Sequence, residues 1–322
     1  MAVYTQVSED ELSAFLADYD IGQALSFSGI TEGVENSNYR LKTTTGDYIL
    51  TLYEKRVNVD DLPFFMNLMA HMAHHGVTCP EPVADQHGTV LKTLNGRAAA
   101  IVTFLDGTSN NTPSAQRCRS AGHALASMHV AGGDFEGHRG NALDHTAWAD
   151  LLASCGDAGE ALKTGITAMA ATRLHDILSN WPEDLPRGVC HADLFPDNVL
   201  FTGDDVTGII DFYFACIDSH AYDLSIMLNA WCFESDGSFN ITKSRQLVAG
   251  YQSVRPLSES EISAIPTLCR GSAMRFFLTR LYDWINTPKD AQVRPHNPMD
   301  YWTRLNFHHQ VNTPEAYGID RS

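Results

Sequence analysis

The chain has 322 residues, of which 44% are hydrophobic, a size and composition that suit a globular protein of two lobes with about 100 to 200 residues each. No stretch reaches the ~20 consecutive apolar residues of a membrane-spanning helix, and the N-terminus lacks the basic start and apolar core of a secretory signal. The net charge of −17 argues against nucleic acid or an anionic membrane as a partner, because binding to either needs clustered Lys and Arg.

The first hundred residues are rich in strand signals and contain two helical stretches. Residues 9–19 have apolar positions at helical spacing after Ser8, which suits an N-cap. A second helix is predicted over residues 61–75, with Pro63 in its first turn and Gly76 at its end. Turn residues predict two strand pairs, namely residues 38–43 with 48–53 around Gly46-Asp47 and residues 89–94 with 98–104 around Asn95-Gly96.

After Leu105 the pattern becomes mainly helical. Helices are predicted over residues 113–130, 145–154, 159–180, 220–233, 243–254, 258–282 and 298–311, and one strand-rich island over residues 188–212 interrupts them. A small sheet-rich lobe followed by a larger helical lobe is an α+β, bilobal plan. We therefore expect an N-terminal lobe over residues 1–105 and a C-terminal lobe over residues 106–322, with a loose tail from residue 312 onward.

Seven cysteines are scattered along the chain without a CxxC pair. A zinc site or a disulfide framework would need close, paired spacing, so the sequence predicts neither. We expect buried, reduced thiols in a cytoplasmic protein, and Cys190 is expected to serve packing rather than act as a nucleophile.

The strand-rich island surrounds an unusually polar loop, residues 191–198. The loop places Asp193 five residues before Asn198, and Asp211 follows thirteen residues after Asn198. Two short strands joined by a turn can bring Asn198 and Asp211 close together. Hard oxygen ligands that converge in this way suit Mg²⁺, which leaves Asp193 to face a nucleophile.

The joint pattern H-x-D-x-x-x-x-N, followed by a strand and D-F, resembles the catalytic loop and metal-binding Asp of protein kinases. The details, with Ala192 in place of the Arg of H-R-D and Tyr213 in place of the Gly of D-F-G, resemble the aminoglycoside phosphotransferase and choline kinase superfamily more closely. Residues 121–129 (AGHALASMH) and 221–225 (AYDLS) extend this likeness. Within the superfamily, three segments resemble bacterial homoserine kinases: residues 33–40 (GVENSNYR), 48–54 (YILTLYE) and 271–283 (GSAMRFFLTRLYD).

The resemblance implies a protein-kinase-like fold and a reaction that depends on ATP and Mg²⁺. The side-chain hydroxyl of L-homoserine would receive the phosphoryl group, giving O-phospho-L-homoserine for threonine biosynthesis. Asp193 would orient this hydroxyl and accept its proton, and Asn198 and Asp211 would hold the metal ion. His191 and Asp223 are expected to support the polar loop.

ATP would bind between the lobes. The resemblance implies that the adenine lies against the linker residues Thr103, Phe104 and Leu105, and that the phosphates lie under Glu35, Asn36, Ser37 and Asn38. Kinases of this fold usually carry a Lys on the third strand, where this sequence has Thr51, and residues 61–75 contain no Glu to pair with it. The cation that clamps the phosphates therefore stays open, with Lys42, Lys55 and Arg56 as the neighbouring cations.

Homoserine is a small zwitterion, so its carboxylate calls for an Arg and its ammonium for a carboxylate. Arg275 and Arg280 lie five positions apart on a predicted helix and do not face one point together. Arg275 is the first candidate for the substrate carboxylate. Asp193 or Asp283 is the candidate for the ammonium.

Two other functions stay open. The first is the same chemistry on another small alcohol, such as choline, methylthioribose or an aminoglycoside. Choline would need an aromatic cage, for which Trp231, Tyr282 and Trp284 are available. The second is a nucleotide-binding module without catalysis, supported by the missing strand Lys and opposed by the intact polar loop.

Overall fold

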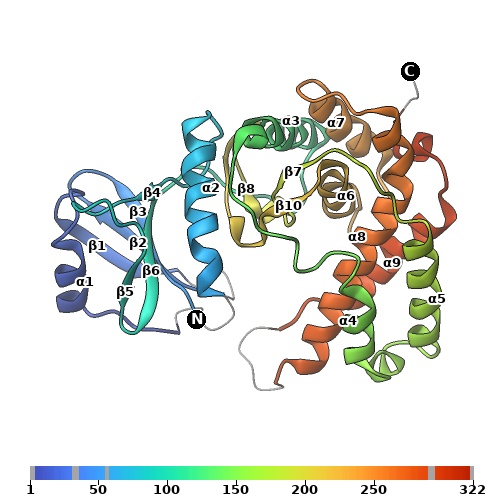
Figure 1. The fold of residues 1–322 in the computed structure, drawn as a ribbon, viewed down its shortest axis with the longest axis horizontal. Coiled ribbons are helices and arrows are strands. Elements are labelled where there is room, and N and C mark those ends of the chain that lie inside the picture. The colour runs from blue at the N-terminus through green and yellow to red at the C-terminus, as the bar shows by residue number, and fades with distance from the viewer. Residues whose placement is uncertain (1–3, 31–35, 55–57, 289–293, 320–322) are drawn as a thin grey trace.

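The computed structural model describes residues 4–30, 36–54, 58–288 and 294–319. A sheet-rich N-terminal region is followed by a mainly helical C-terminal region, and Figure 1 shows the two side by side. The α+β class expected from the sequence is confirmed. Within the described ranges, no helix has the length and apolar character needed to cross a membrane.

One antiparallel sheet forms the N-terminal region. Its strands are β1 (Ala24–Gly29), β2 (Ser37–Thr43), β3 (Asp47–Leu52), β4 (Pro82–Val83), β5 (Lys92–Leu94) and β6 (Arg97–Thr103). The strand order is β1-β2-β3-β6-β4, and β5 pairs with the first residues of β6. Both predicted hairpins are present. Strand β1 was not predicted, because Leu25 and Phe27 alternating with serines are a short, weak strand signal; five of its six residues are exposed.

Alternate residues of the central strands face opposite sides of the sheet. On one side Leu41 and Leu50 are buried against α1 (Glu9–Leu16). Ser8 caps this helix as predicted, since Glu11 N–H donates to its hydroxyl and the Glu11 carboxylate accepts the Ser8 N–H at 2.7 Å. The other side of the sheet faces the helical region.

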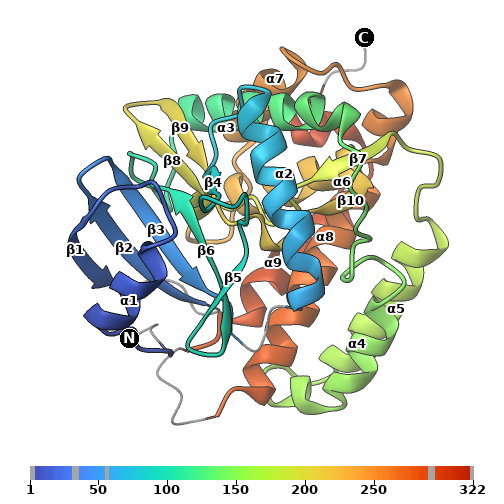
Figure 2. The same cartoon turned by 60° about the vertical axis from the view of Figure 1, so that its left-hand side comes forward.

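Helix α2 (Leu62–His74) lies between the sheet and the helical region (Figures 1 and 2). Pro63 stands in its first turn, and Gly76 follows its end with φ 81°, as predicted. Phe65 and Met69 belong to a buried cluster that continues into the helical region. Each such side chain contributes roughly 1.5–3 kcal/mol on burial, so α2 ties the two regions together.

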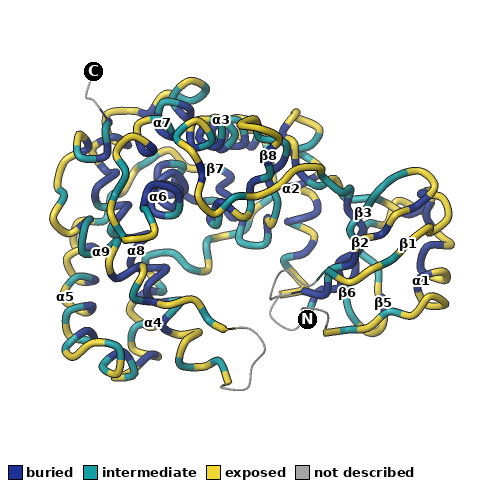
Figure 3. Tube along the Cα trace, turned by 180° about the vertical axis from the view of Figure 1, so that it is seen from behind, coloured by how far each residue is buried: buried dark blue, intermediate teal, exposed yellow. Residues whose placement is uncertain are grey.

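The helices of the C-terminal region surround one central helix. They are α3 (Ala115–Ala131), α4 (Trp148–Cys155), α5 (Ile166–Ser179), α6 (His220–Trp231), α7 (Ile241–Gln252), α8 (Glu259–Asn286) and α9 (Pro298–Gln310). Helix α6 is the central one, and nearly all of its residues are buried (Figure 3). A helix covered on all sides has no polar face, which explains its run of apolar residues.

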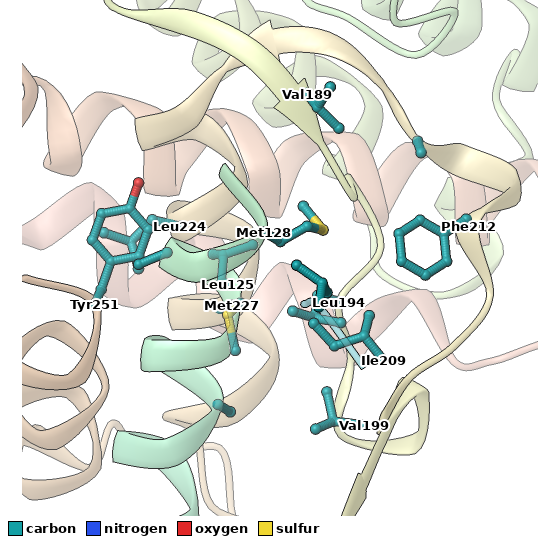
Figure 4. Packing of buried hydrophobic residues seen from close by; sticks show 14 of the residues in the cluster. Leu125, Met128, Val189, Leu194, Val199, Ile209, Phe212, Leu224, Met227 and Tyr251 are labelled. Carbon is teal, nitrogen blue, oxygen red and sulfur yellow. The ribbon is translucent and has the colours of Figure 1, made fainter. Parts of the chain in front are cut away.

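Two short strand pairs lie on this helical core. Strand β8 (Val199–Thr202) pairs with β9 (Asp205–Ile209), and β7 (Arg187–Cys190) pairs with β10 (Cys216–Ser219). Figure 4 shows Leu194, Val199 and Ile209 beside the α3 residues Leu125 and Met128. The polar loop between β7 and β8 therefore stands on a packed apolar base.

Two smaller expectations have different outcomes. All seven cysteines are buried and none forms a disulfide, as predicted. The expected loose tail is wrong for residues 312–319. Tyr317 and Ile319 are 0% and 1% exposed, and the Tyr317 hydroxyl shares a hydrogen bond of 2.8 Å with His308 Nδ1.

Candidate active site

The polar loop brings the residues of the expected motif into one neighbourhood. The Asn198 side-chain amide donates to the Asp193 carbonyl oxygen at 2.9 Å. The Ile210 N–H, next to Asp211 in the chain, donates to the Asn198 carbonyl oxygen at 3.0 Å and extends the β8–β9 pairing. Because the amide nitrogen of Asn198 faces the loop, its Oδ1 faces the other way.

A buried carboxylate on α6 holds the start of the polar loop. Asp223 is 0% exposed and accepts hydrogen bonds from His191 N–H at 2.7 Å, Ala192 N–H at 2.9 Å and His129 Nε2 at 3.0 Å. Burial by itself raises the pKa of Asp223, but the hydrogen bonds from His129 and His191 outweigh it, so the pKa lies below its usual value. The expected structural role of Asp223 is confirmed, because its ionised carboxylate fixes the backbone directly before Asp193.

His191 connects the loop to the segment that carries Asp211. Its ring is buried, and Nε2 bonds to the Ile210 carbonyl oxygen at 3.0 Å, so Nε2 carries a proton. Burial lowers the pKa of His191, and the ring is neutral at pH 7. His191 therefore holds the loop, as expected.

Two non-glycine residues of this region have left-handed backbones, Ala192 with φ 61° and Asp211 with φ 65°. Such a conformation costs on the order of 1–2 kcal/mol per residue. Ala192 is held from both sides, since its N–H donates to Asp223 and its carbonyl oxygen accepts from Arg275 Nη1 at 2.6 Å. The strain is concentrated at the two positions that set the direction of the Asp193 and Asp211 side chains.

Arg275, the first candidate for the substrate carboxylate, lies beneath the polar loop. It is 2% exposed, its Nη1 is used by the Ala192 carbonyl oxygen, and its guanidinium lies 4.3 Å from the Phe276 ring centroid. The structure therefore places Arg275 as a support for the loop backbone. Asp283, the candidate for the ammonium, lies on the exposed side of α8 near the end of the helix.

Hydroxyl groups link the sheet to the segment after Asp211. Thr51, at the position of the usual strand Lys, donates to Asn38 Oδ1 at 2.8 Å. The hydroxyl groups of Tyr53 and Tyr213 lie 3.0 Å apart. Burial raises the pKa of Tyr213 to about 12, so its hydroxyl keeps its proton at neutral pH.

The residues expected to cover the phosphates differ in what their side chains contact. Glu35 lies outside the described residues. Asn36 Oδ1 accepts the Glu54 N–H at 3.2 Å, and Ser37 Oγ donates to Glu54 Oε1 at 2.7 Å. These two side chains hold the strand ends, whereas Asn38 faces the site side of the sheet.

The linker after β6 has backbone N–H groups without a hydrogen-bond partner among the described residues. The Thr103 N–H donates to the Glu81 carbonyl oxygen at 2.9 Å, and the Phe104 N–H donates to the Asp47 carbonyl oxygen at 3.0 Å. Within the described part of the chain, the Leu105 N–H makes no hydrogen bond. Leu105 also lies so close to β9 that a Cβ at Gly208 would approach its Cδ1 to 2.6 Å.

The cations near the expected phosphate position are only partly described. Lys55 and Arg56 lie outside the described residues, and Lys42 is exposed on β2. Arg40 was not singled out from the sequence. Its guanidinium covers the Phe104 ring at 4.2 Å, and its Nη2 lies 2.9 Å from Asp47 Oδ2.

An aromatic cage for choline does not form from the expected residues. Trp231 is 1% exposed and donates from Nε1 to the Leu194 carbonyl oxygen at 2.8 Å. Tyr282 and Trp284 are each 42% exposed on α8. Trp231 supports the polar loop from below and is not available to enclose a ligand.

Comparison with known protein families decides where this chain belongs. The model of the phosphotransferase enzyme family matches residues 26–257, which include the sheet and the polar loop. The chain belongs to the phosphotransferase enzyme family. The superfamily expected from the loop motif is therefore confirmed.

Several curated relatives are named homoserine kinase. The one from Acidiphilium cryptum is 56% identical over 319 residues, covering 99% of this chain and 100% of the relative. Those from Rhodospirillum rubrum and Rhizobium meliloti are 53% and 54% identical and cover 100% of this chain and 100% and 98% of their own. The branch expected from the three N- and C-terminal segments is confirmed.

Solved structures show the same fold at low identity. An amicoumacin kinase in complex with AMP-PNP and Ca²⁺ has a TM-score of 0.71 at 16% identity and covers 96% of each chain. A spectinomycin phosphotransferase in complex with ADP has a TM-score of 0.66 at 12% identity, covering 97% of this chain and 98% of its own. The expected kinase-like fold is confirmed.

Sequence reasoning missed three supports of the polar loop, His129, Trp231 and Arg275. Helical spacing shows which residues share a face but not which neighbour that face contacts. A signal was present for His129, because it ends the segment 121–129 that resembles the superfamily. For Arg275 the sequence offered an arginine beside apolar residues, which suits burial as well as ligand binding.

Proposed function

We propose that this protein transfers the γ-phosphoryl group of ATP to the side-chain hydroxyl of L-homoserine, producing O-phospho-L-homoserine for threonine biosynthesis. The supporting observation is identity of 53–56% along essentially the whole chain to proteins named homoserine kinase. Residues 1–105 would form the nucleotide-binding lobe. Residues 106–322 would form the catalytic and substrate-binding lobe.

Asp193 orients the substrate hydroxyl in this proposal. The hydroxyl oxygen attacks the γ-phosphorus, the bond to the β–γ bridging oxygen breaks, and the hydroxyl proton passes to the Asp193 carboxylate. A carboxylate with an ordinary pKa of ~3.9 is too weak a base to remove that proton beforehand. Phosphoryl transfer does not require this, because its loose transition state depends mainly on positioning. The bonds from Asp223 and Arg275 to the polar loop support that positioning.

The donor set of Asn198 and Asp211 fits Mg²⁺. Asn198 Oδ1 faces away from the loop because its amide nitrogen bonds to Asp193, and Asp211 follows the strand that pairs with Asn198. A carboxylate and an amide oxygen are hard ligands of the kind that Mg²⁺ takes together with phosphate oxygens and water. When bound, the ion supplies positive charge to the phosphate oxygens of ATP.

The nucleotide is assigned to the face of the sheet that carries Asn38. The Leu105 N–H is available to donate to an adenine ring nitrogen, with Thr103 and Phe104 beside it. The segment 35–38 would offer backbone N–H groups to the phosphates. Arg40 adds a cation on this face beside the linker, over Phe104 and paired with Asp47, rather than at the position of the missing strand Lys, which is Thr51.

An ADP-release assay tests the substrate. We expect L-homoserine to stimulate ADP formation, and choline, methylthioribose and kanamycin to give no stimulation above ATP alone. Stimulation by one of the other alcohols and not by homoserine would refute the proposed function. Choline is a poor candidate substrate, because Trp231 is buried under the polar loop and cannot form part of an aromatic cage.

Two isosteric variants test the residue roles. Asp193→Asn should lower kcat by about 10²–10⁴-fold while ATP affinity stays within about threefold. Asp211→Asn should instead weaken Mg²⁺-dependent nucleotide binding, measured by calorimetry. Asp204→Asn in the exposed β8–β9 turn serves as the matched control. Full turnover in Asp193→Asn, or unchanged nucleotide binding in Asp211→Asn, would contradict the role assigned to that residue.

A further inference from the structure

A buried tyrosine on α9 lies between two arginine side chains. Tyr301 is 0% exposed, and the guanidinium carbons of Arg280 on α8 and Arg304 on α9 lie 4.5 Å and 4.4 Å from its ring centroid. The Tyr301 hydroxyl and Arg304 Nη1 are buried, and within the described residues neither has a hydrogen-bond partner. Two cations beside one ring repel each other, so this arrangement favours an anion that can accept their hydrogen bonds.

The arginine pair is connected to the polar loop through a row of packed aromatic rings. Phe195, two residues after Asp193, packs on Phe276 with ring centroids 5.0 Å apart, and Phe276 packs on Tyr301 at 5.1 Å. Burial lowers the pKa of Arg280, and the nearby charges of Asp300 and Asp193 act against that lowering. An anion held by Arg280 would therefore lie within electrostatic range of the carboxylate that faces the substrate hydroxyl.

One carboxylate lies beside Arg280 on its exposed side. Arg280 Nη1 lies 3.5 Å from Asp300 Oδ2, with the two side chains 16% and 54% exposed, so this pair is loose at its acidic end. Burial and Arg280 lower the pKa of His296, whereas Asp197, Asp300 and Asp283 act to raise it. Arg280 and these three aspartates, which come from the polar loop, α8 and α9, therefore all act on His296.

We infer that Arg280, assisted by Arg304, binds the α-carboxylate of the amino-acid substrate, and that the acidic groups around Arg280 attract its α-ammonium. The inference rests on the proposed function and adds the basis of its specificity. A bidentate guanidinium matches a carboxylate in geometry and charge. Arg275 on the same helix is committed to the Ala192 carbonyl oxygen, which leaves Arg280 as the arginine of α8 that faces this region.

The inference predicts that the enzyme selects a free amino acid by its carboxylate. The test compares L-homoserine with 3-aminopropan-1-ol, which has the same hydroxyl chain and amine but no carboxylate. In Arg280→Gln, KM for homoserine should rise about 10- to 100-fold, the range for a lost hydrogen bond to a charged group. For 3-aminopropan-1-ol, kcat/KM should change less than about threefold, and KM for ATP should be unchanged.

Controls separate binding from folding. Arg280→Lys keeps the positive charge but loses the two parallel N–H donors of the guanidinium. It should therefore bind homoserine more tightly than Arg280→Gln but more weakly than wild type. Arg304→Gln should also lower the preference for homoserine over 3-aminopropan-1-ol, by a smaller factor than Arg280→Gln. Arg119→Gln makes the same change on the exposed surface of α3 and should leave all constants at the wild-type values. Thermal melting of each variant reports its folding.

The outcomes distinguish this inference from the proposed function. A wild-type enzyme without homoserine-dependent ADP release would overturn the proposed function, and this inference with it. An active wild-type enzyme whose homoserine preference survives in Arg280→Gln and Arg304→Gln would overturn the inference alone. If Arg280→Gln melts early, Arg280→Lys and Arg304→Gln decide, and equal losses for both substrates in them would indicate a structural role and overturn the inference.

Discussion

The isosteric substitution Asp223→Asn tests whether one buried carboxylate sets the geometry of the polar loop. One oxygen of Asp223 accepts the Ala192 N–H, and the other accepts His191 N–H and His129 Nε2. An Asn has a single acceptor oxygen, so its NH₂ group must point at one of these donors. Losing a hydrogen bond to a charged group removes about 1.5–3 kcal/mol, and leaving a buried N–H unpaired costs about 1–3 kcal/mol more. We expect the free energy of unfolding to fall by about 3 to 5 kcal/mol.

Urea denaturation followed by circular dichroism measures this loss, with the m-value as a check on two-state behaviour. In buffer where the variant is folded, kcat for homoserine should fall at least about tenfold, because the backbone before Asp193 is no longer fixed. KM for ATP should change less than about threefold. Asp204→Asn is again the matched control. A variant within about 0.5 kcal/mol of wild type, with kcat within about twofold, would refute the reasoning.

Three further predictions follow from buried polar groups. Arg275→Met should lower kcat for homoserine about tenfold with KM changed less than about threefold, because Arg275 holds the loop backbone; a raised KM alone would return it to the carboxylate role. Burial lowers the pKa of His220 and of His308 to about 3. In the unfolded chain these two histidines have a pKa of ~6.5 and bind protons more readily than in the folded protein. Their contribution to the free energy of unfolding is therefore complete above about pH 6.5 and is lost as the pH falls towards 3. At pH 5 each histidine has lost roughly 2 kcal/mol of its contribution to the free energy of unfolding. His220→Phe should remove the part due to His220 from the fall in that free energy between pH 7 and 5, measured by urea denaturation. The same fall in the variant as in wild type would contradict a lowered pKa for His220. Tyr213→Phe should reduce the free energy of unfolding by about 1 kcal/mol because the Tyr53 hydroxyl loses its partner, and the double variant with Tyr53→Phe should regain part of it; strictly additive losses would show that the two hydroxyl groups do not interact.

Local chemistry explains how much of the site the sequence could predict. Asn198 and Asp211 flank a two-strand turn, so pairing of β8 with β9 brings them together without any long-range information. Asp193 is five residues before Asn198, and one side-chain amide bond closes that short loop. The α+β plan could also be predicted, because strand and helix patterns occupy separate parts of the chain.

The supports of the polar loop that come from distant parts of the chain could not be predicted, because local sequence patterns carry no information about them. Arg275 is 83 positions from Ala192, and His129 is 94 positions from Asp223. Helical periodicity places Arg275 on a face of α8, but only packing of α8 against the loop decides whether that face meets substrate or backbone. Ser37 illustrates the same limit, since it belongs to the expected phosphate segment and yet its hydroxyl is used to hold Glu54.

The net charge of −17 makes the position of the cations decisive. Two unit charges 4 Å apart interact with about 1 kcal/mol in bulk water and about 4 kcal/mol at the effective dielectric of a protein surface site. Exposed acidic groups act through water and are screened within about 10 Å at 0.1 M salt. Arg280, with a side chain only 16% exposed, acts at short range with little screening. An anionic group therefore gains attraction where it enters beside Tyr301. The acidic surface that repels polyanions can attract the ammonium of a zwitterion next to the largely buried Arg280.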